Sequence, residues 1–236
     1  MSTVTESAAQ MRYARIAGFV YLLLIVLFMG GQLLIGHVTG SGTFAERTVR
    51  IVAELPLYRA ALVLQFLASV FTVLLAYSLY VVLKSVDEHI ARLALYFRLG
   101  EAFGGLTAIV AFAALALRTE PEFAQSLGAT QMKALVDLAQ AADFASFNIG
   151  IVFFSFGSTL FYRLFLRTPY LPRVLSAFGM FASALTFVVA VTSLVMPAWG
   201  DALQVGWVPI FIAEIVTGIL LMVRGAQSAQ AAAIAR

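Results

Sequence analysis

Residues 60–83 read AALVLQFLASVFTVLLAYSLYVVL, and no charged side chain interrupts them. A helix needs about 20 mostly apolar residues to cross a hydrocarbon core about 30 Å thick, so this stretch is long enough to span a membrane. The membrane core offers no water to exposed backbone groups, and a helix bonds these groups within one segment. The stretch therefore predicts a transmembrane helix.

Five other blocks of the chain have a similar length and character. They are residues 16–35, 93–117, 142–161, 174–196 and 207–223. The composition agrees, because 62% of the residues are hydrophobic and 11% are charged, with a mean hydropathy of +0.96. A soluble domain has about 45–50% apolar and about 25% charged residues. The first block is too long for the core of a signal peptide, so we expect it to remain as a span. The sequence predicts an all-α polytopic membrane bundle of six transmembrane helices.

The basic residues predict how this bundle is oriented. With the N-terminus in the cytoplasm, nine Lys and Arg residues fall on the inner side and five on the outer side. Positive residues favour the cytoplasmic side, and six spans place both chain ends there. We expect a multi-pass protein of the inner (plasma) membrane, with a cytoplasmic segment at 1–15, a membrane domain at 16–225 and a cytoplasmic tail at 226–236. The basic residues are scattered singly, which argues against a nucleic-acid partner.

Two outer loops carry patterns that mark helix starts. Thr43 followed by Glu46 has the spacing of a capping box, and Thr119 followed by Glu122 repeats it. Thr130 is a competing start that would lead into the fourth span. We expect short helices in these loops, lying along the outer membrane face. Aromatic residues near the span ends are expected to be interfacial anchors; they are Tyr13, Tyr58, Tyr80, Tyr96, Tyr162, Tyr170, Trp199 and Trp207.

The chain lacks the residues that many enzymes and cofactor-binding proteins use. It has no cysteine, which removes thiolate nucleophiles, iron–sulfur clusters and thiolate zinc sites. Its two histidines, His37 and His89, fall in predicted loops on opposite sides of the membrane, so they form no shared metal, haem or catalytic set. We therefore predict no catalytic residue, no metal site and no cofactor, and an enzyme is the least supported function.

Ionisable side chains inside the spans are the default functional candidates, because each costs about 2.5–3.5 kcal/mol near the bilayer centre. Arg98 and Glu101 lie in the third span, on one helix face, and Glu214 lies in the sixth. Gly100 and Gly104 flank Glu101 in a pattern that lets a neighbouring helix approach closely. If the three charges share a dry pocket, the surplus negative charge requires a proton, a bound cation or water. The cluster is therefore either a proton or cation site or a structural clamp between spans.

Other polar residues of the fourth span and of the following junction are weaker candidates. Asp143 lies near the outer end of the fourth span, where an acidic residue complements the helix dipole. Asn148 lies deeper, where it serves either interhelical hydrogen bonding or ligand contact. Arg163, Arg167 and Arg173 surround the junction between the fourth and fifth spans. They either set the topology or bind phospholipid headgroups.

Four stretches of the chain resemble a known family. They are RIAGFVYLLLIV (15–26), FRLGEAFGG (97–105), LFYRLFLRTPYLPRVLSAFG (160–179) and PIFIAEIVTGILLMVRG (209–225). They resemble the bacterial multi-pass membrane family catalogued as domain of unknown function 4386, and the junction with its paired prolines is the most specific element. The resemblance implies a six-span membrane domain and no particular reaction. On this resemblance the characteristic family positions are Arg98, Glu101, Arg163, Pro172, Arg173, Glu214 and Gly225.

Two functions fit these observations. In the first, the protein binds or transports a small apolar molecule or cation through the cluster of Arg98, Glu101 and Glu214. In the second, it is a non-catalytic membrane subunit or sensor, the cluster only holds the spans together, and the loops meet a second copy or another membrane protein. An open cavity of about 300 Å³ or more at the cluster favours the first function, and a dry, internally satisfied core favours the second. The lipid bilayer is a partner in both.

Overall fold

The computed structural model describes residues 2–104 and 107–226, and these residues form helices joined by short turns, with no strand among them. The long helices are α1 (Ser2–Thr39), α3 (Leu55–Leu83), α4 (Glu88–Phe103), α5 (Thr107–Thr119), α7 (Ala129–Phe165), α8 (Arg173–Val195) and α10 (Val208–Arg224). The short elements are α2 (Phe44–Ala53), α6 (Pro121–Ser126), η2 (Pro197–Trp199), α9 (Gly200–Leu203) and η3 (Gln204–Trp207).

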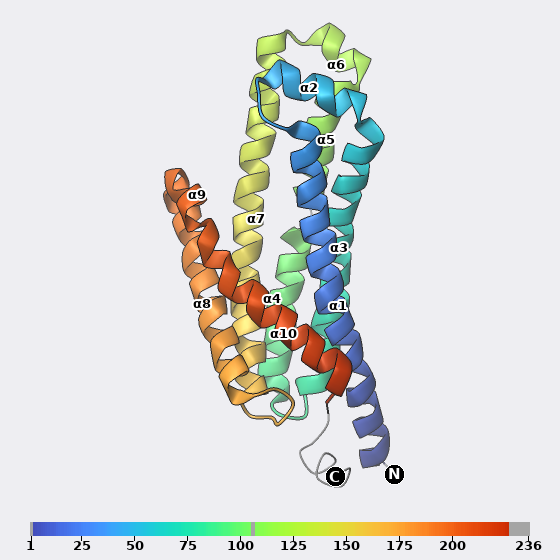
Figure 1. Cartoon of the computed structure of the whole chain (residues 1–236), viewed down its shortest axis with the longest axis vertical. Coiled ribbons are helices and arrows are strands. Elements are labelled where there is room, and N and C mark those ends of the chain that lie inside the picture. The colour runs from blue at the N-terminus through green and yellow to red at the C-terminus, as the bar shows by residue number, and fades with distance from the viewer. Residues whose placement is uncertain (1, 105–106, 227–236) are drawn as a thin grey trace.

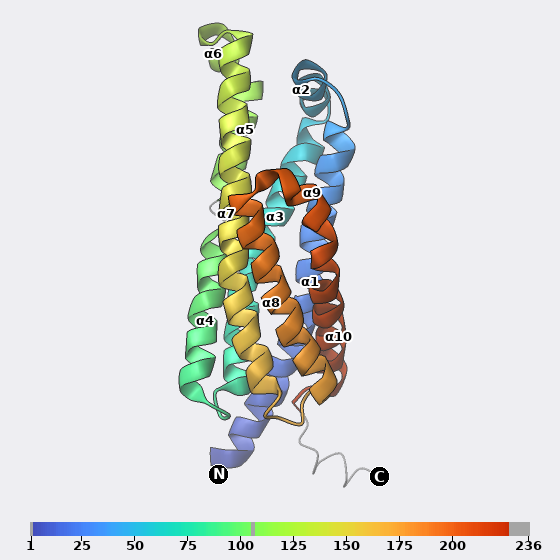
Figure 2. The same ribbon diagram turned by 90° about the vertical axis from the view of Figure 1, so that its left-hand side faces the viewer.

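Six segments are long and apolar enough to cross a membrane, which confirms the predicted number of spans. They are Ala8–Thr39, Leu55–Leu83, Glu88–Thr119, Ala129–Phe165, Arg173–Val195 and Gln204–Arg224. The third span consists of two helices, α4 and α5. The fourth span is longer than its apolar block, because α7 begins at Ala129. The first part of α7, together with α5 and α6, extends beyond the turn at α9 (Figure 2).

The spans form a ring in chain order. α1 packs on α3, α3 on α4, α4 on α7, α7 on α8 and α8 on α10, and α10 closes the ring against α1. Figure 1 shows α10 crossing in front of the bundle, with its last turn at the same end as the start of α1. The largest apolar core takes side chains from all six spans, among them Tyr21, Leu79, Ala94, Phe161 and Ala182. Side chains that point into the ring therefore meet residues far away in the sequence.

Glycines allow the closest helix contacts of this ring. A Cβ atom placed on Gly18 of α1 would lie 2.2 Å from the backbone nitrogen of Met222 in α10. A Cβ atom on Gly104 would lie 3.4 Å from the Cα atom of Gly150 in α7. The close approach predicted beside Glu101 is thus made by α7, because neither helix carries a side chain at that contact.

The helix α2 lies over the end of the bundle where α1 and α5 end and α3 begins (Figure 1). The Thr43 backbone N–H donates to Glu46 Oε2 at 2.8 Å, and the Glu46 N–H donates to Thr43 Oγ1 at 3.3 Å. These two bonds confirm the predicted capping box, and they lower the pKa of Glu46 from its ordinary value. Ile51 anchors the helix in a small apolar cluster with Val38, Leu62 and Leu115.

The second predicted capping box is wrong. The Thr119 hydroxyl donates to the carbonyl of Leu115 at 3.1 Å, so Thr119 belongs to the last turn of α5. α6 begins at Pro121, where a proline suits a first helical turn and has no N–H for a side chain to cap. The competing start predicted at Thr130 lies two residues after the observed one. Gly128 is the N-cap, its N–H donates to Gln131 Oε1 at 3.0 Å, and α7 begins at Ala129.

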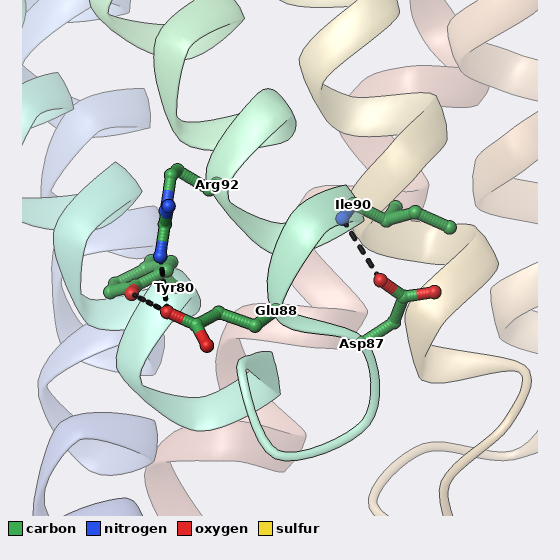
Figure 3. A network of polar contacts seen from close by, with 5 residues as sticks. All are labelled: Tyr80, Asp87, Glu88, Ile90 and Arg92. Atoms are coloured by element: carbon green, nitrogen blue, oxygen red, sulfur yellow. Dashed lines mark hydrogen bonds and ion pairs between the residues drawn. The ribbon is translucent and has the colours of Figure 1, made fainter.

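The turn between α3 and α4 is held by carboxylates (Figure 3). Asp87 Oδ1 accepts the N–H of Ile90 at 3.1 Å and so caps α4. The Tyr80 hydroxyl and the Arg92 guanidinium both reach Glu88. Asp87 Oδ2 lies 3.6 Å from Arg167 Nη1, which links this turn to the turn between α7 and α8.

Candidate functional site

Arg98 is the largest side chain among the fully buried residues, and its exposed fraction is 2%. Its Nη1 atom lies 2.9 Å from Glu101 Oε2, one turn along α4, and 3.3 Å from Ser158 Oγ of α7. The guanidinium also lies over the ring of Phe154, 4.7 Å from its centroid. A Cβ atom on Gly157 would come within 2.8 Å of Arg98 Cγ, so α7 has room for the arginine stem only because residue 157 is glycine.

The two carboxylates of the predicted cluster differ in how they are held. Glu101 pairs with Arg98, and 19% of its side chain remains exposed. Glu214, on α10, is half-buried and interacts electrostatically with Arg98 without forming an ion pair to it among the described residues. The structure thus brings all three charges of the cluster to the centre of the ring and pairs one carboxylate directly.

Three hydroxyl groups that the sequence analysis did not place in the cluster also lie there. Tyr21 of α1 is 2% exposed, and its hydroxyl is within electrostatic reach of Arg98 and Glu214. The Tyr162 hydroxyl lies 3.2 Å from Thr217 Oγ1, and both side chains are buried. Tyr162 was expected as an interfacial anchor because it lies near the end of a span. That expectation is wrong, because the Tyr162 side chain is buried. Gly179 of α8 leaves space for its ring between α7 and α8.

A separate signal could have placed Thr217 with Glu214. The two residues are three positions apart on α10, so they share a helix face, as Arg98 and Glu101 do on α4. No comparable local signal exists for Tyr21 or Tyr162, because their place depends on which helices are neighbours.

The polar centre is not saturated with hydrogen bonds. Arg98 Nε and Glu214 Oε1 are buried and have no hydrogen-bond partner among the described residues. Buried polar atoms in proteins are nearly always paired with protein groups or with water. A donor and an acceptor near the middle of the bundle therefore have no protein partner among the described residues, and the side chains of Glu101 and Glu214 are partly exposed.

Among the described residues, the weaker candidates make no hydrogen bond or ion pair with Arg98, Glu101 or Glu214. Asp143 is exposed on α7. Asn148 is buried, but its amide nitrogen donates to the carbonyl of Phe144 in its own helix at 2.9 Å. Arg163, Arg167 and Arg173 are exposed near the α7–α8 turn, and their predicted role at lipid headgroups stays a prediction. No group of three or more His, Asp or Glu side chains that could hold a metal ion occurs in the described part of the chain.

Comparison with known proteins identifies the family. Residues 16–225 match the family described as "Domain of unknown function (DUF4386)". The chain belongs to this family. No curated protein and no solved structure matches it significantly. The DUF4386 match covers all six spans apart from the first turns of α1, so Arg98, Glu101 and Glu214 all lie inside the family domain.

Proposed function

We propose that this DUF4386 protein binds or carries a small apolar molecule or a cation at the polar centre of its helix ring. The observation that carries this proposal is the pair of buried, unpartnered atoms, Arg98 Nε and Glu214 Oε1, beside carboxylates that remain partly exposed. A cluster that served only to clamp the helices would gain most by satisfying every polar atom internally, since each unsatisfied group costs about 1–3 kcal/mol.

The charge of the centre supports a cationic ligand. Arg98 balances Glu101 at 2.9 Å, and Glu214 has no ion-pair partner in the described chain. An isolated carboxylate inside a membrane protein is costly unless a proton, a cation or water neutralises it. A bound cation would remove this cost. Binding of a cation at Glu214 should therefore stabilise the folded protein.

The second candidate is a non-catalytic membrane subunit or sensor in which the same residues are structural. The Arg98–Glu101 ion pair and the bond from Arg98 to Ser158 favour it, because they join α4 to α7. This candidate predicts that the centre holds no ligand, and that its substitutions change only the stability of the bundle.

The test is a thermal-stability screen of the purified protein in detergent with small amines and apolar amphiphiles. Ligand binding to the folded state raises the melting temperature by mass action. A ligand of the centre should stabilise the unmodified protein and lose most of this effect in Glu214→Gln and Glu101→Gln. The matched control is Glu54→Gln, which changes an exposed carboxylate outside the centre and should respond like the unmodified protein. Equal ligand responses in all four proteins would overturn the proposal and leave the structural clamp.

We also propose the orientation from the basic residues, with both chain ends cytoplasmic in the plasma membrane. The bias of nine inner to five outer basic residues supports it. The start of α1 and the end of α10 lie at one end of the bundle, as an even number of spans requires (Figure 1).

A further inference from the structure

Three aromatic side chains meet on the outer side of the polar centre. Phe28 of α1 stacks on Phe147 of α7, with ring centroids 5.9 Å apart and an interplanar angle of 9°. Phe147 also contacts Trp207 of η3, at 5.8 Å and 43°. In the ring of spans α1 and α7 are separated by other helices on both sides, so the stacked pair crosses the interior. We call these three residues the aromatic layer.

The aromatic layer is in register with the polar centre. Phe28 follows Tyr21 by seven positions in α1, Phe147 precedes Phe154 by seven in α7, and Trp207 precedes Glu214 by seven. Seven residues make nearly two turns of a helix, so each pair lies on one helix face and about 10 Å apart along it.

The seven-residue spacing occurs in all three segments. The aromatic layer therefore lies about 10 Å along the helices from the level of the charged groups. Tyr21 and Phe154 lie at the polar level, where Phe154 faces Arg98. The aromatic layer lies two turns farther toward the end of α1 and the beginnings of α7 and α10. Its three side chains are half-buried, so part of each ring surface remains open.

We propose that the ligand is an arylalkylammonium, a molecule with a protonated amine at one end and a flat apolar body at the other. This inference rests on the proposed function. The ammonium binds at Glu214, and the body lies against the aromatic layer.

The head group follows from charge and hydrogen bonding. Arg98, Glu101 and Glu214 sum to one negative charge, which a monovalent cation balances. Glu214 Oε1 lacks a donor, and an ammonium group supplies three. Arg98 supplies none, because its Nη1 atom faces Glu101 and Ser158 and its Nε atom makes no hydrogen bond among the described residues.

The body follows from the aromatic layer. Aromatic rings gain energy from stacking beyond the area that they bury, and their faces attract cations. Trp207 presents the largest ring of the three, and it sits on the 3-10 turn that begins α10, the helix that also carries Glu214. The last span, which contains η3 and α10, therefore carries a contact for each end of the ligand.

The test uses isothermal titration calorimetry of the full chain in detergent with four probes. They are 3-phenylpropylammonium, the neutral 3-phenylpropan-1-ol, n-propylammonium and sodium ion. We expect 3-phenylpropylammonium to bind about tenfold or more tightly than the alcohol, because the alcohol can still donate a hydrogen bond to Glu214 but lacks the positive charge that strengthens it. We expect n-propylammonium to bind about threefold to tenfold more weakly than 3-phenylpropylammonium, because it lacks the ring.

Substitutions assign the two ends separately. Glu214→Gln should reduce the affinity for 3-phenylpropylammonium to that for the alcohol. Trp207→Leu should weaken 3-phenylpropylammonium about threefold to tenfold and leave n-propylammonium unchanged. Trp199→Leu is the matched control, because Trp199 lies near the same end of the bundle but is exposed outside the aromatic layer, and it should change neither affinity. Phe147→Leu gives a second variant of the layer, with the same expected pattern, if Trp207→Leu does not fold.

The outcomes distinguish this inference from the proposed function. Equal affinity for the amine and the alcohol, unchanged in Glu214→Gln, would overturn the ammonium assignment. Equal affinity for the two amines, unchanged in Trp207→Leu and Phe147→Leu, would overturn the role of the aromatic layer. Preference for sodium ion, or no heat with any probe, would overturn the arylalkylammonium. The proposed function would then stand or fall separately on the wider ligand screen with Glu214→Gln and Glu101→Gln.

Discussion

At the scale of single residues, Arg98 decides whether the polar centre can exist. It is the cation that lies beside Glu101 and near Glu214, and it is almost completely buried. Arg98→Ala should destabilise the protein by about 3–5 kcal/mol, because a buried carboxylate loses its partner. Chemical or thermal unfolding in detergent measures this loss. Arg224→Ala removes an exposed arginine at the end of α10 and should change stability by less than about 0.5 kcal/mol. Similar losses in both variants would contradict the account of Arg98.

A second residue-scale prediction concerns Asp87, whose two oxygens have different roles. Oδ1 caps α4 at Ile90 (Figure 3), and Oδ2 faces Arg167. Asparagine caps a helix about as well as aspartate, whereas alanine costs about 1 kcal/mol. Asp87→Ala should therefore lower the free energy of unfolding by about 1 kcal/mol more than Asp87→Asn does. If both variants lost the same stability, the ion pair with Arg167 and not the cap would hold this turn.

The residue scale also shows how far the sequence can predict the site. Arg98 and Glu101 were predicted to meet because three positions on a helix are close in space whatever the rest of the chain does. Glu214 was a candidate because a charge inside a span is costly. Tyr21 and Tyr162 carried no such signal, since tyrosine is tolerated both at a membrane interface and in a core. Only the neighbouring helices make them part of the centre.

At the scale of elements, the closure of the ring depends on α1 meeting α10. Gly18 makes this contact, and an added Cβ atom would collide with the backbone of Gly218 and Met222. Gly18→Ala should destabilise the protein by about 1–3 kcal/mol, because backbone atoms cannot move aside as a side chain does. Gly30→Ala, on the same helix, is the matched control, since nothing lies within 4 Å of its added Cβ atom. Melting temperatures in detergent compare the two. A loss in Gly30→Ala as large as that in Gly18→Ala would contradict this packing.

The short elements show why local patterns predict some helix starts and miss others. Thr43 and Glu46 form a capping box because nothing else competes for their side chains. Thr119 has the same spacing to Glu122, but its hydroxyl bonds within α5, which continues to that residue. A capping pattern is therefore reliable only where the preceding helix has already ended, and the pattern itself does not contain that information.

At the scale of the whole molecule, the orientation can be tested because the chain has no cysteine. A single introduced cysteine is then the one target for a membrane-impermeant maleimide applied to intact cells. We expect Gln125→Cys, at the α6 end, to react from outside. His89→Cys, in the first turn of α4 at the opposite end of the bundle, should react only after the cells are permeabilised. The reverse pattern would show that the topology is inverted. Reaction of both variants in intact cells would contradict the placement of the His89 end of the bundle in the cytoplasm.

The central claim is that the middle of the ring admits a ligand, and the accessibility of Glu214 tests it most directly. In membrane vesicles, Glu214→Cys and Glu101→Cys should react with a small water-soluble thiol reagent, because both side chains remain partly exposed. Leu221→Cys, at a fully buried position of α10, should stay unreacted on the same time scale. If both central cysteines were as unreactive as Leu221→Cys, the centre would be a sealed clamp and the account would be contradicted.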